Sequence, residues 1–213
     1  MKKVALFVAV AALSAGTLVS CGKSSKGKMD GEWNVDSMSM TSSSTSGSST
    51  SSNSTKIEGT TITMVNTSGS NSVTTTGTVN SAVWNINKDG SWDREISYTI
   101  TQSGASTKTT MKSSGKWDFA AGVGEFKKNE RVVFSTTSET STEVTTSGSF
   151  TATETSTDTY ADGEMSEVFV ITESKKKNLE MSASGSGNSS YSSPGISGTS
   201  SHTSETTVKM TLK

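Results

Sequence analysis

Apolar residues alternate with polar ones over much of this chain, and this period of two constrains its fold more than any other feature. The clearest example runs through Trp92, Arg94, Ile96, Tyr98 and Ile100, which share one face of a strand. No segment after the N-terminus has the 3.6-residue period of a helix. Ser and Thr make up more than a third of the 213 residues, and Thr favours strands while both disfavour helix interiors. The sequence therefore predicts an all-β chain.

Further strand signals follow one another along the chain and are separated by turn residues. Asp89-Gly90 and Asp162-Gly163 supply the positive φ angles that tight hairpins need. We predict one domain over residues 31–213, an antiparallel up-and-down β-barrel of about eight to ten strands. The predicted strands cover residues 31–35, 60–65, 79–87, 92–100, 107–111, 115–119, 131–137, 143–154, 167–173, 179–183 and 208–212.

Three segments that are almost devoid of apolar residues, 41–55, 138–159 and 184–204, are predicted to be long Ser/Thr-rich loops. Only 30% of the chain is hydrophobic, below the roughly 45–50% of globular domains, so part of it is expected to lack a packed core. Two alternatives stay open: residues 143–154 also fit a solvent-facing strand, and residues 41–55 also fit a longer stalk.

The N-terminus carries a second pattern. Lys2 and Lys3 precede an apolar run that ends in Leu18-Val19-Ser20-Cys21, and the run is shorter than the roughly 20 residues of a membrane-spanning helix. The four residues resemble the lipobox of bacterial lipoproteins, in which the Cys is acylated with diacylglycerol and usually palmitate.

This resemblance implies a cleaved signal peptide over residues 1–20 and anchoring in the lipid bilayer through the acylated Cys21. We expect residues 21–30 to form a flexible tether. By resemblance to the Gram-negative sorting rule, Gly22 in place of Asp favours the outer membrane of the cell envelope; which face carries the body is left open. The alternative is an ordinary secretory peptide with an incidental Cys.

Several short motifs then resemble the lipocalin-like lipoproteins of Gram-negative bacteria. Gly31-Glu32-Trp33 stands where that family has the Gly-x-Trp of its first strand. The other matching stretches are the aromatic hairpin 84–92, Gly115–Phe119, Leu179–Met181 and Val208–Leu212. The resemblance implies a lipocalin-like barrel in which the first Trp packs across the closed end.

A barrel of this size either holds one small ligand or is filled by its own side chains. Both alternatives stay open: a pocket for a small hydrophobic ligand, or a filled barrel that serves as the scaffold of a non-catalytic structural or surface-interaction lipoprotein. The candidate ligand-binding residues are Trp33, Trp84, Trp92, Tyr98, Trp117 and Phe119.

The remaining composition argues against other function classes. The predicted signal peptide takes two of the 19 basic residues and none of the 20 acidic ones, which leaves a net charge near −3 and no electrostatic case for nucleic acid. With His202 as the only His, in a predicted solvated loop, we expect no catalytic triad, no metal site, no cofactor and no enzyme. Asn85-x-Asn87-x-Asp89-Gly90 is interpreted as a hairpin turn, not a calcium loop.

Overall fold

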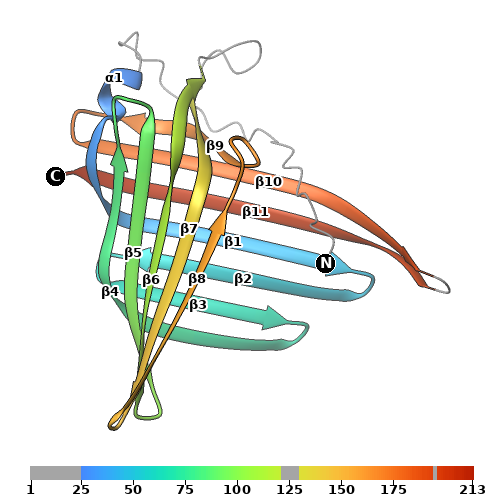
Figure 1. Ribbon diagram of the computed structural model, residues 1–213. Coiled ribbons are helices and arrows are strands. Elements are labelled where there is room, and N and C mark those ends of the chain that lie inside the picture. The colour runs from blue at the N-terminus through green and yellow to red at the C-terminus, as the bar shows by residue number, and fades with distance from the viewer. Residues whose placement is uncertain (1–24, 121–129, 194–195) are drawn as a thin grey trace.

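The computed structural model describes residues 25–120, 130–193 and 196–213, and within them the chain is almost entirely strand (Figure 1). A one-turn helix, α1 (Lys26–Met29), precedes the strands. The strands are β1 (Gly31–Ser46), β2 (Ser49–Glu58), β3 (Thr61–Ser68), β4 (Asn71–Ile86), β5 (Ser91–Gln102), β6 (Ala105–Ala120), β7 (Arg131–Ser147), β8 (Phe150–Thr159), β9 (Met165–Ser174), β10 (Asn178–Ser193) and β11 (Ile196–Leu212).

These strands pair antiparallel to form a closed barrel of ten strands, with β8 added to β7 as an extra strand. Strands that follow one another in the chain lie side by side, except that β9 pairs with β7 and β11 closes the circuit on β1. The prediction of an all-β, antiparallel barrel of eight to ten strands is confirmed.

The two ends of the barrel differ. At one end, which we call the closed end, residues 31–34 of β1 pair directly with residues 83–86 of β4. Farther along, the β2–β3 hairpin lies between β1 and β4. In Figure 1 the hairpins β5–β6 and β7–β8 extend downward while β1–β2, β3–β4 and β10–β11 extend to the right, so the two groups diverge away from the closed end.

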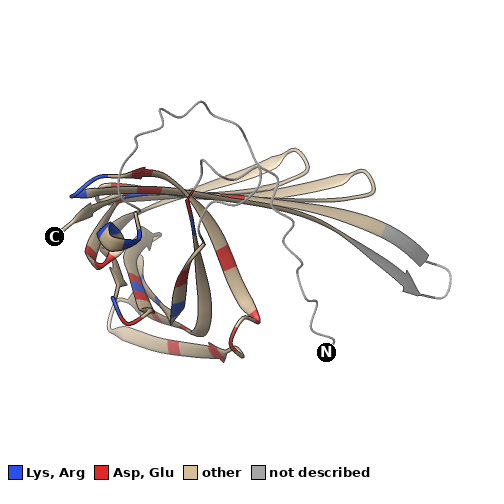
Figure 2. Cartoon of the chain, turned by 90° about the horizontal axis from the view of Figure 1, so that it is seen from above, with Lys and Arg blue, Asp and Glu red and all other residues tan. Residues whose placement is uncertain are grey.

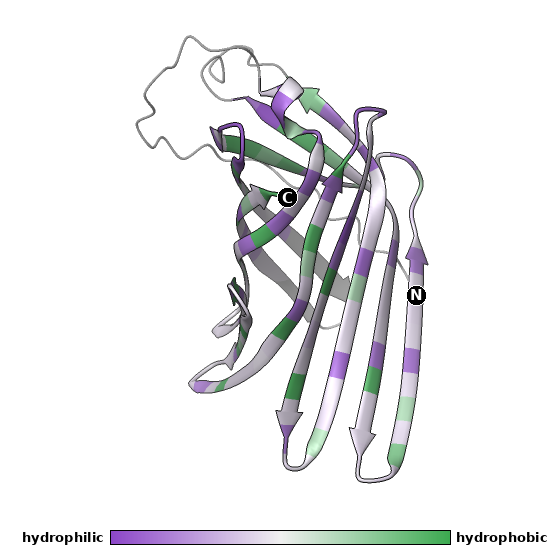
Figure 3. Ribbon diagram, turned by 90° about the vertical axis from the view of Figure 1, so that its left-hand side faces the viewer, coloured by the Kyte–Doolittle hydropathy of each residue, from purple (hydrophilic) through white to green (hydrophobic). Residues whose placement is uncertain are grey.

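The core sits at the closed end because the alternation predicted from the sequence directs every second side chain inward. In β5, Trp92, Ile96 and Tyr98 are buried while Asp93 is exposed. Hydrophobic and hydrophilic bands alternate along the strands in Figure 3. The buried cluster also contains Met29, Trp33, Val35, Met38, Ile57, Ile62, Trp84, Ile86, Trp117, Val132, Phe134, Phe169, Leu179, Met181, Val208 and Met210.

The two Gly-x-Trp motifs need their glycines for different reasons. Gly31 has a φ of +144°, which L side chains rarely adopt, and a Cβ there would overlap the side chain of Leu212. Gly115 lies where the pairing of β6 with β7 shifts register, and a Cβ there would overlap the backbone carbonyl of Ser135. Each glycine thus permits a close approach beside the Trp that follows it.

The prediction of long Ser/Thr-rich loops is wrong. Residues 41–55 lie in β1 and β2, residues 138–159 in β7 and β8, and residues 184–204 in β10 and β11, apart from 194–195, which lie outside the described residues. Residues 143–154, which also fitted a strand, do lie in the β7–β8 hairpin.

Paired hydroxyl groups explain these strands. Thr140 pairs with Thr157 at 3.2 Å and Thr142 with Thr155 at 3.3 Å, each between side-chain oxygens across the β7–β8 hairpin. Ser43 and Thr203 are joined in the same way at 2.7 Å between β1 and β11. Such cross-strand pairs and the backbone ladder stabilise a sheet without apolar burial.

The flexible tether predicted for residues 21–30 is wrong for residues 25–30. Ser25 and Met29 are buried, and the backbone N–H of Ser25 donates to both carboxylate oxygens of Glu130, at 3.0 and 3.2 Å. Trp33 Nε1–H donates to the carbonyl of Met29 at 2.8 Å. Helix α1 is therefore packed onto the closed end. Residues 1–24, with the predicted signal peptide and Cys21, lie outside the described residues.

Candidate functional site

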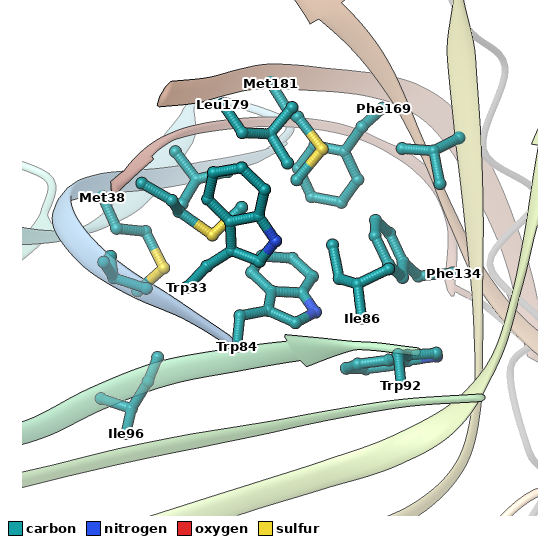
Figure 4. Packing of buried hydrophobic residues seen from close by; sticks show 14 of the residues in the cluster. Trp33, Met38, Trp84, Ile86, Trp92, Ile96, Phe134, Phe169, Leu179 and Met181 are labelled. Atoms are coloured by element: carbon teal, nitrogen blue, oxygen red, sulfur yellow. The ribbon is translucent and has the colours of Figure 1, made fainter. Parts of the chain in front are cut away.

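The aromatic residues predicted to bind a ligand belong to, or pack against, the buried cluster, in which Trp33, Trp84 and Trp92 lie close together (Figure 4). Trp84 and Trp92, which flank the same turn, are only 2% and 4% exposed. The candidates buried in the core are Trp33, Trp84, Trp92, Tyr98 and Trp117, and Phe119 is partly buried against them.

Trp84 lies at the centre of an aromatic cluster drawn from four strands. Its ring centroid lies 5.9 Å from that of Trp92, 4.9 Å from Phe134 and 6.0 Å from Phe169. Phe134 also packs edge-on against Trp92 at 5.3 Å and against Phe169 at 5.9 Å. These are the separations of aromatic rings in direct contact. Side chains of the protein itself therefore occupy this part of the barrel.

Three of the four indole N–H groups donate hydrogen bonds to backbone carbonyls. Trp117 donates to the carbonyl of Asn87 at 2.8 Å, and Trp92 to that of Ser135 at 3.3 Å, in addition to the bond from Trp33 to Met29. Trp84 Nε1 is buried and finds no partner among the described residues. Trp92 and Trp117 thus join their rings to distant backbone segments, and Trp33 joins its ring to the end of α1, which is a structural role.

A charged group lies on the inner face of the barrel beside this aromatic cluster. The guanidinium carbon of Arg94 lies 5.3 Å from the ring centroid of Trp84, a cation–π contact. Arg94 Nη2 donates to Ser113 Oγ at 3.3 Å, and Ser113 Oγ donates to Glu139 Oε1 at 3.3 Å. The hydroxyl of Tyr160 donates to Glu139 Oε2 at 3.4 Å. Strands β5, β6 and β7 therefore share one polar network.

Glu167 of β9 completes the charged group. Burial raises the pKa of Glu167, while the charge of Arg94 and a hydrogen bond with Thr206 oppose the rise. Burial likewise lowers the pKa of Arg94, against the attraction of Glu167 and Glu139. Glu167 is nevertheless solvent-exposed, so the neighbouring strands surround its carboxylate but do not exclude water from it. These residues mark the boundary between the packed core and the water-accessible part of the barrel.

Sequence reasoning placed Arg94 in the alternating strand but did not select it as a site residue, and it missed Glu139 and Glu167. One signal was available for Arg94: a charged residue stood at an inward position between Trp92 and Ile96. Glu139 and Glu167 gave no such signal, because neither flanks an apolar alternation that fixes its direction. Only the pairing of β7 with β6 and β9 brings them near Arg94.

Two grooves lie outside the aromatic cluster. One, of about 470 Å³, lies beside the turn that contains Asp89, and an ion pair of 2.8 Å between Lys116 and Asp162 lies in it. The other, of about 200 Å³, lies on the polar part of the sheet and is lined by Ser42, Ser43, Ser44, Ser51, Asn53, Gly185, Ser186, Gly187, His202, Thr203 and Ser204. Neither is lined mainly by the predicted aromatic residues.

His202 lies in β11, not in the solvated loop that the sequence predicted, and its Nε2 is 3.1 Å from Ser200 Oγ.

The turn at Asp89 is a hairpin, as interpreted: Asn87 Nδ2 donates to Ser91 Oγ at 3.0 Å. Asp89 accepts hydrogen bonds from Ser91, which lower its pKa. In the part of the chain that the structure describes, no three His, Cys, Asp or Glu side chains lie where they could hold a metal ion.

Comparison of the chain with protein-family models, with curated proteins and with solved structures gives no match. The described ranges contain no helix of the length and hydropathy that crossing a membrane would require.

Proposed function

We propose that the protein is a non-catalytic interaction lipoprotein, anchored in the outer membrane through an acylated Cys21, whose lipocalin-like barrel is a filled scaffold. The observation that carries the proposal is the mutual packing of Trp84, Trp92, Phe134 and Phe169, which fills the closed end of the barrel with the protein's own side chains. The lipobox-like residues 18–21 support the anchor.

The extended hairpins supply the contact surface. The side chains of Val73 in β4 and Phe150 in β8 are 63% and 65% exposed, and both lie near hairpin tips, away from the core. Exposed apolar side chains on polar hairpins are suited to contact with another macromolecule. In Figure 2 the ends of the β1–β2 and β3–β4 hairpins, which extend to the right, show no charged residues.

Site-specific photo-cross-linking in the living cell tests this proposal. A photoreactive amino acid is placed at Phe150 or Val73, and, as a matched control, at the exposed Lys88 in a turn at the closed end. We expect discrete adducts of higher mass from the two hairpin positions and none from the control. Absence of adducts at both hairpin positions, or equal adducts at Lys88, would contradict an interaction through the hairpins.

A second candidate, binding of a small ligand, rests on the charged group Arg94, Glu139 and Glu167. Glu167 is exposed, while Arg94 and Glu139 are half-buried and charged, so a ligand bound beside them would be polar or amphipathic. The test is calorimetry with Arg94→Gln: a ligand co-purified with the protein would bind this variant more weakly. If no ligand co-purifies with the protein, the filled scaffold remains the better explanation.

A further inference from the structure

Among the described strands, β8 leaves one backbone edge without a partner. It stands at the end of the sheet order, and within the described residues it pairs only with β7, from Phe150 opposite Ser147 to Thr159 opposite Ser138. Of its ten residues, all except Ala152 are exposed. An edge strand of this length presents a row of unpaired N–H and C=O groups, which is the template that an additional strand uses.

Several features that usually protect such an edge are missing from β8, and the charged residues that it does carry, Glu154 and Asp158, are both acidic. It contains no Lys, no Pro and no register shift against β7. Gly148 and Ser149 form a two-residue turn, so Ser147 and Phe150 form a hydrogen-bonded pair across β7 and β8. Hydrogen-bonded and non-hydrogen-bonded pairs alternate from there, and each β8 residue of a non-hydrogen-bonded pair directs its N–H and C=O away from β7. The outward-facing residues are Thr151, Thr153, Thr155, Thr157 and Thr159.

The charge of this hairpin indicates what would pair with that edge. Residues 138–164 contain six acidic side chains and no Lys or Arg. Glu139 stands opposite Asp158, and Glu143 opposite Glu154, so two carboxylate pairs face each other on one side of the hairpin. Like charges directly opposite each other destabilise a strand pair. A basic strand beside β8 would relieve this repulsion.

We propose that β8 accepts a Lys- or Arg-rich extended segment of a partner protein as an additional strand. This proposal rests on the proposed function, since it names the kind of partner that the β7–β8 hairpin would bind. Backbone hydrogen bonds with the outward-facing threonines hold the segment. Because side chains of a strand alternate, basic residues at every second position all lie beside Glu154 and Asp158.

Peptide binding to the purified, full-length protein tests the strand addition. The probe is a fluorescent Lys-Thr repeat of about ten residues, matching the length of β8. The controls are a Glu-Thr repeat and a Lys-Thr repeat with Pro at alternate Thr positions. We expect only the uninterrupted Lys-Thr peptide to bind, and less tightly as salt rises. Equal binding of the Pro-containing peptide would overturn the proposal, because that peptide keeps the charge but cannot form the ladder.

The variants Thr153→Pro and Thr153→Val form a matched pair. The Pro removes an N–H that faces away from β7, so the hairpin keeps its ladder while the edge loses a donor; the Val keeps the donor. We expect Thr153→Pro to weaken peptide binding about tenfold or more and Thr153→Val to leave it unchanged. The double variant Glu154→Gln, Asp158→Asn should also bind more weakly. Unchanged affinity in Thr153→Pro would overturn the proposal.

The same substitution separates this inference from the proposed function. Thr153→Pro is combined with the photoreactive residue at Phe150. Loss of the adduct supports strand addition. An adduct that persists overturns strand addition yet leaves the interaction lipoprotein standing, since the hairpin then contacts its partner through another surface.

Discussion

At the scale of single residues, close approach and burial explain most of the special positions. Gly31 and Gly115 precede Trp33 and Trp117, and in both places an added Cβ would meet atoms of another strand. The sequence showed these motifs but not their cause, because the contacts come from strands far apart in the chain. Both glycines are therefore needed for the close packing of the closed end.

The substitution Gly115→Ala is predicted to lower the free energy of unfolding by about 2 kcal/mol or more, because the new methyl group would overlap the Ser135 carbonyl. Gly27→Ala is the control, since a Cβ at Gly27 has no atom within 4 Å. It should change stability by less than about 0.5 kcal/mol. Urea unfolding followed by tryptophan fluorescence measures both, and equal stability of the two variants would contradict the packing at Gly115.

The raised pKa of Glu167 predicts a pH dependence. A carboxyl whose pKa is higher in the folded than in the unfolded chain stabilises the fold below its ordinary pKa, and this contribution is lost as the pH rises through the folded value. Glu167→Gln should therefore raise the Tm at neutral pH relative to the unmodified protein, with a smaller difference near pH 4. Glu205→Gln in β11 is the control. A Tm lowered by Glu167→Gln at neutral pH would contradict the assignment.

At the scale of elements, apolar alternation predicted the inner parts of the strands and missed their outer parts. Trp92–Ile100 lies within β5 as expected, and the turns at Asp89-Gly90 and Asp162-Gly163 are confirmed. The whole of β2 except its last residues fell in a predicted loop. The reason is that Ser and Thr pair across strands without forming an apolar face, so hydrophobic and polar residues do not alternate in these segments. Low hydrophobicity was mistaken for lack of structure.

Hydrogen–deuterium exchange distinguishes strands from loops at residues 41–55. Because β1 pairs with β2 and β11, its amides in this segment should exchange more slowly than those of a free synthetic peptide of the same sequence. The peptide is the matched reference because it has the same intrinsic exchange rates. Exchange as fast as in the peptide would show that the Ser/Thr hairpins are not formed.

At the scale of the whole molecule, the barrel combines a filled closed end with hairpins that diverge from it. The aromatic cluster and α1 close one end, while the hydroxyl-rich strands extend past the charged group around Arg94. The aromatic residues predicted as candidate ligand-binding positions all belong to, or pack against, the buried cluster. The packing of this cluster could not be read from the sequence, because Phe134 and Phe169 come from strands far along the chain.

Native mass spectrometry of the protein purified from its own cells tests the anchored, filled scaffold most directly. We predict the mass of a chain that begins at Cys21 and carries its acyl groups, with no other small molecule bound. The variant Cys21→Ser should retain the uncleaved N-terminus and gain no lipid. A stoichiometric small-molecule adduct on the folded protein, or an unmodified Cys21, would contradict the account.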